Sequence, residues 1–253
     1  MRPNPLPSHL RLRSNLLLAP PFLMALVVFG SLALMASAFD KSGRVQHRIA
    51  RFWARASVFF SGSRLKVIGL KNIPAETAVF AANHTSYMDT PVVFASLPFQ
   101  FRILAKKELW TLPFIGWYLD RSGQIPIDTA NPRTTVSSFA AGVRTLRAGL
   151  SVFVFPEGGR TPDGNLQTFL NGAAYLAIRA QVPLVPVALI GVRDLLPMHT
   201  SHFYPSPQGV PLKLIFGAPL ATKGRTLRQS EALTEELRQS IAGLIEFHRD
   251  CRS

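Results

Sequence analysis

An uncharged stretch near the N-terminus constrains this chain more than any other feature. No charged residue occurs from Ser14 to Phe39, and the part after Pro20-Pro21, from Phe22 to Phe39, would span about 27 Å as an α-helix. That length is just sufficient to cross the hydrocarbon core of a bilayer, so we predict a membrane anchor. Two alternatives stay open. The prolines could fold the stretch into a re-entrant helical hairpin, and Ala36-Ser37-Ala38 resembles a signal-peptidase site.

Positive charge borders this apolar stretch. The chain carries a net charge of +14, and residues 1–55 contain eight arginine and lysine residues against a single acidic one, Asp40. Such an excess needs a polyanionic neighbour, and lipid headgroups and nucleic acid both qualify electrostatically. Because half of the excess borders an apolar segment, we predict membrane lipids as the partner and no nucleic acid. More basic residues follow the stretch than precede it, which favours an inner cell membrane with the remaining chain on the cytoplasmic side.

Short apolar runs alternate with helical patterns after a predicted basic linker from Asp40 to Ser63. This alternation is typical of an α/β domain, in which helices flank a central, mostly parallel or mixed sheet. We therefore predict an anchor and linker in residues 1–63 and one α/β domain in residues 64–253. The only cysteine, Cys251, excludes a disulfide framework. The predicted strands are Leu65–Gly69, Ala78–Ala82, Arg102–Ala105, Gln124–Ile127, Ser151–Phe155, Leu184–Leu189 and Leu212–Phe216.

Two helices are predicted with defined starts. Apolar residues spaced by three and four indicate an amphipathic helix over Pro132–Arg147, and Pro132 suits its first turn. Near the C-terminus, Thr226 and Gln229 form a possible capping box before a second amphipathic pattern. We expect both helices to pack on the sheet.

Polar residues follow the predicted strand Ala78–Ala82. His84 comes two residues after it, and Asp89 comes five residues later, before Pro91. A turn between them would bring the carboxylate to the imidazole, whereas regular helix from His84 onward would separate the two side chains by about 140°. A carboxylate that holds one imidazole nitrogen lets the other accept a proton from an attacking hydroxyl. The pair alone also fits a helix cap beside a hydrogen-bonded histidine.

A second polar cluster follows the predicted strand Ser151–Phe155. It reads Pro156-Glu157-Gly158-Gly159-Arg160-Thr161 and combines a carboxylate, two glycines and a guanidinium. Glycines let the backbone approach a ligand closely, and arginine can bind phosphate through two hydrogen bonds. In isolation, an exposed ion pair at a turn would explain the cluster as well.

Three blocks of this sequence resemble motifs of the glycerolipid acyltransferase family. Asn83-His84-Thr85-Ser86-Tyr87-Met88-Asp89 resembles its N-H-x4-D motif, and Phe155–Thr161 is similar to its F-P-E-G-T-R-S block. Val182-Pro183-Leu184-Val185-Pro186-Val187 is similar to its V-P-[IVL]-V-P-V block. The order of the blocks also agrees, and the resemblance covers about residues 65–220.

The resemblance implies an O-acyltransferase that uses neither a cofactor nor a metal. Its donor would be acyl-CoA or acyl carrier protein, and its acceptor a lysophospholipid such as 1-acyl-sn-glycerol-3-phosphate. His84 would be the general base, and Asp89 would orient it. Glu157 and Arg160 would shape the acceptor phosphate site. The other substrate-binding residues expected from the matched motifs are Gly158, Thr161 and Asn83.

One block departs from the family pattern. Gly123–Thr129 is similar to G-x-x-F-I-x-R but has Pro126 for the aromatic residue and Thr129 for the arginine. Arg133, at a predicted helix start, could supply the missing cation, with helix N-terminal amides helping. The acceptor therefore stays open, with lyso-ornithine lipid as one alternative.

The sequence supports two other classes of function less well. A hydrolase that uses Ser86 would need a G-x-S-x-G elbow, which the sequence does not contain. A non-catalytic membrane-binding protein would explain the charge but not the order of the motifs.

Overall fold

A seven-stranded sheet forms the centre of the protein. The computed structural model describes residue 12 and residues 14–128, 131–161, 163–196 and 211–250. The strands lie in the order β1-β7-β6-β2-β5-β3-β4, and every neighbouring pair is parallel except β6 and β7, which are antiparallel. Their bounds are β1 Leu65–Ile68, β2 Val79–Ala82, β3 Phe101–Lys106, β4 Ile125–Ile127, β5 Ser151–Val154, β6 Leu184–Ile190 and β7 Leu212–Phe216.

The sequence predicted all seven strands to within one residue at each end. Their residues are short apolar runs because helices cover both faces of the sheet, as expected for parallel strands. The α/β class with a mixed sheet is therefore confirmed.

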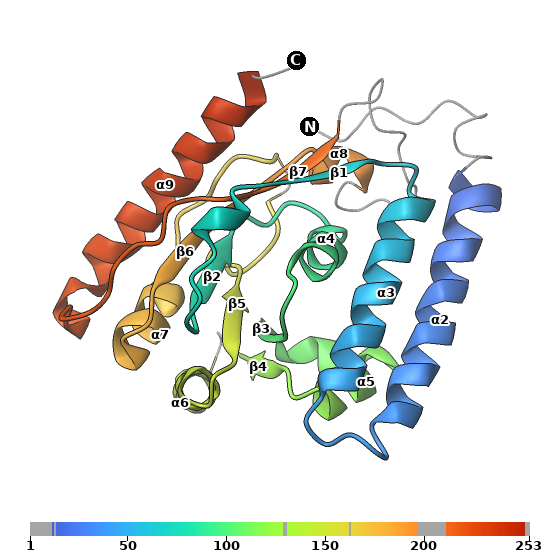
Figure 1. The fold of residues 1–253 in the computed structure, drawn as a ribbon, viewed down its shortest axis with the longest axis horizontal. Helices are drawn as coiled ribbons and strands as arrows, with labels where there is room; N and C mark the ends of the chain where they lie inside the picture. The colour runs from blue at the N-terminus through green and yellow to red at the C-terminus, as the bar shows by residue number, and fades with distance from the viewer. Residues whose placement is uncertain (1–11, 13, 129–130, 162, 197–210, 251–253) are drawn as a thin grey trace.

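Two layers of core lie on opposite faces of this sheet. On one face, Phe80 and Phe153 pack with α4 (Asp89–Ser96) and with a further helix, α3 (Arg44–Phe60). On the other face, Val79 and Val152 pack against α6 (Pro132–Arg147), α7 (Gly172–Ala180) and α9 (Ser230–Asp250). Figure 1 shows these two sets of helices on either side of the strands. The shorter elements are η2 (Leu70–Asn72), η3 (Lys107–Thr111), α5 (Ile115–Arg121), α8 (Val192–Leu195) and η5 (Leu227–Gln229).

Both predicted amphipathic helices are present. The helix α6 has the predicted bounds, Pro132–Arg147. Before α9, the Thr226 backbone N–H donates to Gln229 Oε1 at 2.9 Å, and the Thr226 side chain in turn accepts the Gln229 backbone N–H. The capping box is thus confirmed, and the helix that follows it buries Leu233, Leu237 and Ile241 completely.

The N-terminal apolar stretch is helical. A short π-helix, η1 (Ser14–Leu18), leads into α2 (Ala19–Ala36), and Pro20 and Pro21 lie in its first turn, where no intrahelical N–H donor is needed. The prolines therefore do not fold the stretch into a hairpin. Leu16–Ala36 has a mean hydropathy of 2.2 and, by length and composition, is the one helix among the described residues that could cross a membrane.

The predicted linker from Asp40 to Ser63 is wrong, because most of it forms α3. Ala50, Ala54 and Val58 of this helix are buried in the core with α4. Figure 1 shows α3 between α2 and α4, so the two N-terminal helices lie side by side against the sheet domain. Arg44, Arg48 and Arg55 of α3 are exposed, and Arg51 is partly buried. Most of the buried side chains of this helix are small or polar, which weakens the apolar pattern. The domain boundary at residue 64 stays a prediction.

Candidate active site

The two polar clusters meet at one edge of the sheet. Strands β2 and β5 are parallel neighbours, so the segments that follow them leave the sheet side by side. The Glu157 Oε1 atom accepts a hydrogen bond from the His84 backbone N–H at 2.8 Å. The His84 carbonyl accepts one from the Thr161 N–H at 2.9 Å. The second cluster thus holds the peptide groups on both sides of His84.

A turn brings His84 and Asp89 together. Asp89 is the first residue of α4, and its Oδ2 atom lies 2.8 Å from His84 Nδ1. The same oxygen accepts the backbone N–H groups of Thr85 at 2.6 Å and Ser86 at 2.8 Å. This arrangement confirms the predicted turn and excludes regular helix between the two residues. Because Nδ1–H donates to the carboxylate, Nε2 is the nitrogen that can accept a proton.

A second contact fixes the plane of the imidazole. The His84 ring stacks on Phe155 with ring centroids 4.0 Å apart and an interplanar angle of 17°. The His84 side chain keeps 16% of its surface exposed, whereas Asp89 is completely buried. The imidazole is therefore held on one face by Phe155 and on one edge by Asp89, and part of its surface stays accessible.

Glu157 supports the loops around His84. Its second oxygen, Oε2, accepts the Gln167 N–H at 3.3 Å. Burial raises the pKa of Glu157 to about 7, although its two backbone hydrogen bonds act in the opposite direction. The carboxylate therefore contacts backbone amides of two loops, and Glu157 does not line the cavity described next.

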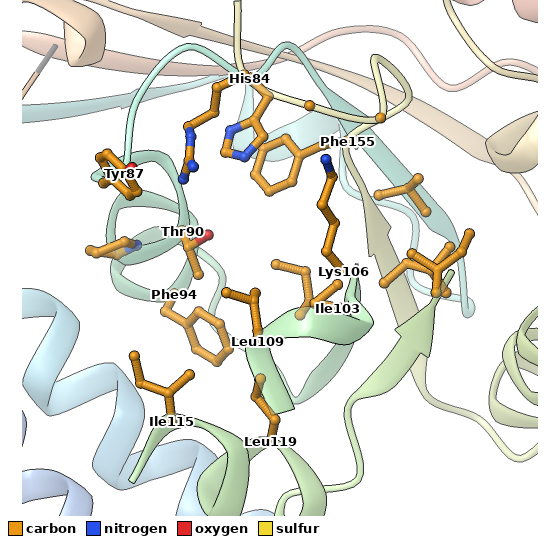
Figure 2. Close-up of a pocket in the computed structure, with 18 of the residues that line it drawn as sticks. His84, Tyr87, Thr90, Phe94, Ile103, Lys106, Leu109, Ile115, Leu119 and Phe155 are labelled. Carbon is orange, nitrogen blue, oxygen red and sulfur yellow. The ribbon is translucent and has the colours of Figure 1, made fainter. Parts of the chain in front are cut away.

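A cavity of about 860 Å³ opens beside His84. Its volume lies in the range of small-molecule sites, and most of its wall is apolar. Figure 2 shows His84 and Phe155 at one end of the cavity, and Phe94, Leu109, Ile115 and Leu119 towards the opposite end. The helix α2 contributes Phe22, Leu26, Phe29, Gly30 and Ala33 to the wall.

Two cations line the polar end of this cavity. The Arg160 guanidinium lies 3.7 Å from the centre of the Tyr87 ring. Lys106, the last residue of β3, extends into the cavity near Phe155 (Figure 2). Lys106 and Tyr87 were not among the residues predicted from the sequence. The available signal for Lys106 was its place at the end of a buried strand, the same signal that selected His84.

The remaining predicted residues lie in different surroundings. Gly158 lines the cavity with φ +70°, a conformation that favours glycine. Thr161 is buried, and only its backbone contact with His84 links it to the site. Asn83 is also buried, and its amide exchanges hydrogen bonds with the Leu189 N–H and carbonyl at 2.8 and 3.0 Å, so it ties β2 to β6. Arg133 lies in the first turn of α6, and its side chain is outside the described part of the structure, as is Thr129.

A serine nucleophile has no support from this geometry. The Ser86 hydroxyl is buried, donates to the Leu196 carbonyl at 2.8 Å, and accepts the Met88 N–H at 3.1 Å. These contacts engage the hydroxyl, and no hydrogen bond among the described residues joins it to the His84 ring. Across the described ranges, no group of three or more histidine, cysteine, aspartate or glutamate side chains could hold a metal ion.

Comparison with known sequences gives a consistent set of relatives. The sequence model of the family described as Acyltransferase matches residues 64–190. The chain is 33% identical over 179 residues to a chloroplastic 1-acyl-sn-glycerol-3-phosphate acyltransferase of Arabidopsis thaliana, with 70% of this chain and 49% of that protein covered. It is 32% identical over 151 residues to a 1-acyl-sn-glycerol-3-phosphate acyltransferase of Pseudomonas aeruginosa, with 57% and 58% covered. The matched region thus spans about half the length of these relatives.

A solved structure shares the fold. The crystal structure of a 1-acyl-sn-glycerophosphate acyltransferase from Thermotoga maritima aligns with a TM-score of 0.79, covering 96% of this chain and 99% of that one. The two sequences are 24% identical, so the likeness shows a common architecture.

Proposed function

The chain belongs to the acyltransferase family, and we propose that it transfers a fatty acyl chain from a thioester donor to the free hydroxyl of 1-acyl-sn-glycerol-3-phosphate. The observation that carries this proposal is the His84–Asp89 pair at the polar end of a long apolar cavity. The names of the relatives in plants and bacteria support the choice of acceptor.

The proposed reaction uses His84 as a general base. Nε2 accepts the proton of the acceptor hydroxyl while the hydroxyl oxygen attacks the thioester carbonyl. Asp89 keeps Nδ1 protonated and stabilises the imidazolium that forms. When the tetrahedral intermediate collapses, the C–S bond breaks, the ester remains, and the thiolate leaves and takes up the proton. Neither an acyl-enzyme nor a metal takes part.

Two cations support a phosphate-bearing acceptor. Arg160 and Lys106 both line the cavity beside His84, and no described carboxylate forms an ion pair with either. A phosphomonoester carries up to two negative charges, and charge-assisted hydrogen bonds to it are about twice as strong as neutral ones. We propose that the acceptor phosphate binds between these two side chains, with its free hydroxyl directed at His84.

The apolar part of the cavity is proposed to hold an acyl chain. Gly30 of α2 lines the cavity, and a Cβ built at Gly30 would meet no atom within 4 Å. A larger side chain at this position therefore has open space to enter.

Filling this space tests the acyl site. We expect Gly30→Leu to shift the preference towards shorter acyl donors by roughly tenfold, because a single methylene group in an apolar pocket is worth about 1–3 kcal/mol. The measurement is the chain length of product formed from a mixture of acyl thioesters. Val28→Leu, on the exposed face of α2, is the matched control. An unchanged product profile in Gly30→Leu would place the acyl chain elsewhere.

The packing of α2 supports attachment at a membrane surface. This helix lies beside α3, whose exposed side carries Arg44, Arg48 and Arg55. A perpendicular crossing by α2 would draw these arginines towards the hydrocarbon, at about 2.5–3.5 kcal/mol for each residue near the bilayer centre. We propose instead that α2 lies in the interface with its exposed leucines and valines in the lipid, on the cytoplasmic side of the membrane, where thioester donors occur.

The decisive experiment is an acceptor panel with purified protein in vesicles. Labelled acyl-CoA and acyl carrier protein are each offered with 1-acyl-sn-glycerol-3-phosphate, a lysophosphatidylethanolamine, lyso-ornithine lipid and monoacylglycerol. We expect phosphatidic acid to form fastest. Faster acylation of lyso-ornithine lipid would assign another acceptor to the same chemistry. If no acceptor in the panel is acylated, the proposed acyltransferase activity is contradicted.

A further inference from the structure

The guanidinium of Arg160 is held by an aromatic ring. It lies 3.7 Å from the centroid of the Tyr87 ring, and its Nε atom is buried without a hydrogen-bond partner. Among the described residues, no carboxylate lies within ion-pair distance of Arg160. An arginine side chain has many rotamers when nothing restrains it. The Tyr87 ring is therefore the contact that fixes the position of this cation.

The other end of this contact belongs to the catalytic turn. Tyr87 lies between Ser86 and Asp89, and the Asp89 carboxylate holds the Ser86 backbone N–H. About half of the Tyr87 side chain is exposed, and the residue lines the cavity together with His84 (Figure 2). The same turn thus positions His84, the proposed base, and the Tyr87 ring that contacts the Arg160 guanidinium.

Stacking suits an arginine that must bind an anion. A cation–π contact uses the face of the guanidinium and leaves its in-plane N–H donors available. A carboxylate partner would occupy those donors and repel a phosphate. Two parallel N–H···O bonds from the open edge can then form with a phosphate in a fixed orientation.

We propose that Tyr87 is a positioning residue for the acceptor: its ring holds the Arg160 guanidinium with the donor edge open to the acceptor phosphate. This inference rests on the proposed function, because it concerns how the same site recognises its phosphate. Tyr87 is expected to act through Arg160 and to take no part in proton transfer.

Kinetics with three variants separate this role from a structural one. Tyr87→Leu should raise the KM for 1-acyl-sn-glycerol-3-phosphate about 3- to 30-fold, the range expected for loss of a cation–π contact. The KM for the acyl donor and kcat should change little. Tyr87→Phe keeps the ring and should retain the low acceptor KM. Phe247→Leu removes another exposed ring, from α9, and controls for general loss of aromatic surface.

A double-mutant cycle tests the partner. In an Arg160→Ala background, Tyr87→Leu should have no further effect on the acceptor KM, because the ring has nothing left to hold. Additive effects of the two substitutions would overturn the proposal. An acceptor KM in Tyr87→Leu equal to that of wild type would overturn it as well.

Equilibrium binding without an acyl donor separates this inference from the proposed reaction. Calorimetry compares binding of 1-acyl-sn-glycerol-3-phosphate and monoacylglycerol to the full chain in detergent. We expect wild type and Tyr87→Phe to prefer the phosphate-bearing lipid, and Tyr87→Leu to lose most of that preference. If this pattern holds but no acyl transfer occurs, the proposed function fails and the role of Tyr87 stands. If transfer occurs but all three proteins show the same preference, the role of Tyr87 fails alone. If wild type shows no preference for the phosphate-bearing lipid, the proposed role of Tyr87 is overturned as well.

Discussion

Two histidines of this protein make similar contacts in opposite surroundings. His84 Nδ1 lies 2.8 Å from the Asp89 carboxylate, and His47 Nε2 lies 3.0 Å from the Phe99 carbonyl. Both rings also contact aromatic side chains: His84 stacks on Phe155, and His47 lies 5.0 Å from the Phe101 ring centroid. Neither a hydrogen bond nor an aromatic neighbour therefore distinguishes the proposed catalytic histidine.

The partner and the exposure distinguish them. His47 is 3% exposed, and burial lowers its pKa to about 4, with nearby Arg102 and Arg51 acting in the same direction. A neutral backbone carbonyl cannot balance a full positive charge, so His47 stays neutral and joins α3 to the segment before β3. Asp89 can balance an imidazolium, and His84 has an edge open to the cavity. The comparison predicts that His84 affects rate and His47 affects stability.

The largest effect is expected from His84→Ala. Removing a positioned general base should lower acyl transfer by about 10²–10⁴-fold. The stability should change less, because the Asp89 carboxylate keeps its hydrogen bonds from the Thr85 and Ser86 N–H groups. The measurement is initial velocity with saturating acceptor and donor, together with a thermal unfolding curve. Near-normal velocity in the variant would refute His84 as the base. A large decrease in the unfolding temperature of His84→Ala would mean that His84, like His47, is needed for stability.

A smaller loss of rate is expected from Asp89→Asn. The amide oxygen can still accept the Thr85 and Ser86 N–H groups, so the turn should keep its shape. The amide cannot stabilise an imidazolium as a carboxylate does, and kcat should fall by about 10²-fold, at the lower end of the range expected for His84→Ala. Single-turnover kinetics measures this step directly. A rate in Asp89→Asn equal to that of wild type would mean that Asp89 only shapes the turn.

The sequence predicted the sheet well and the N-terminal region less well. Strands such as β2 and β5 are short, continuously apolar runs that end in polar residues, so their bounds followed from local pattern. The hydrogen bond between Glu157 and the His84 backbone depends on the parallel pairing of these two strands, which a local pattern does not give. The helix α3 was taken for a linker because Gln46 and His47 are buried polar residues and its other core contacts come from alanines. Its place in the fold depends on packing against α2 and α4, a tertiary arrangement that the pattern within one segment does not show.

The candidate site was predicted only where a residue lies beside a motif. His84, Asp89 and the loop of Glu157 belong to such blocks, and the structure brings them together. The contact between Tyr87 and Arg160 joins residues 73 positions apart and has no sequence signature. Likewise, the apolar cavity is assembled from α2, α4 and α5, and no single segment reveals it.

The pH dependence of stability gives the smallest and most specific test of the comparison. The pKa of His47 is about 4 in the folded protein, against an ordinary value of 6.5 in the unfolded chain. The unfolded state therefore binds a proton first as the pH falls. The contribution of His47 to stability is fully present above about pH 6.5 and is lost as the pH decreases towards 4.

We expect His47→Gln to remove this dependence, because the glutamine amide can donate to the Phe99 carbonyl but does not titrate. The free energy of unfolding of wild type relative to His47→Gln should fall by up to roughly 3 kcal/mol between pH 7 and pH 4, at 1.36 kcal/mol for each pKa unit. Denaturant titrations of both proteins in detergent across this range measure the difference, and acyl transfer at pH 7 should be nearly unchanged. If the free energies of unfolding of the two proteins changed with pH in parallel, His47 would bind its proton as readily in the folded protein as in the unfolded chain. Its carbonyl partner and burial would then not be what separates it from His84, and the contrast would rest on access to the cavity alone.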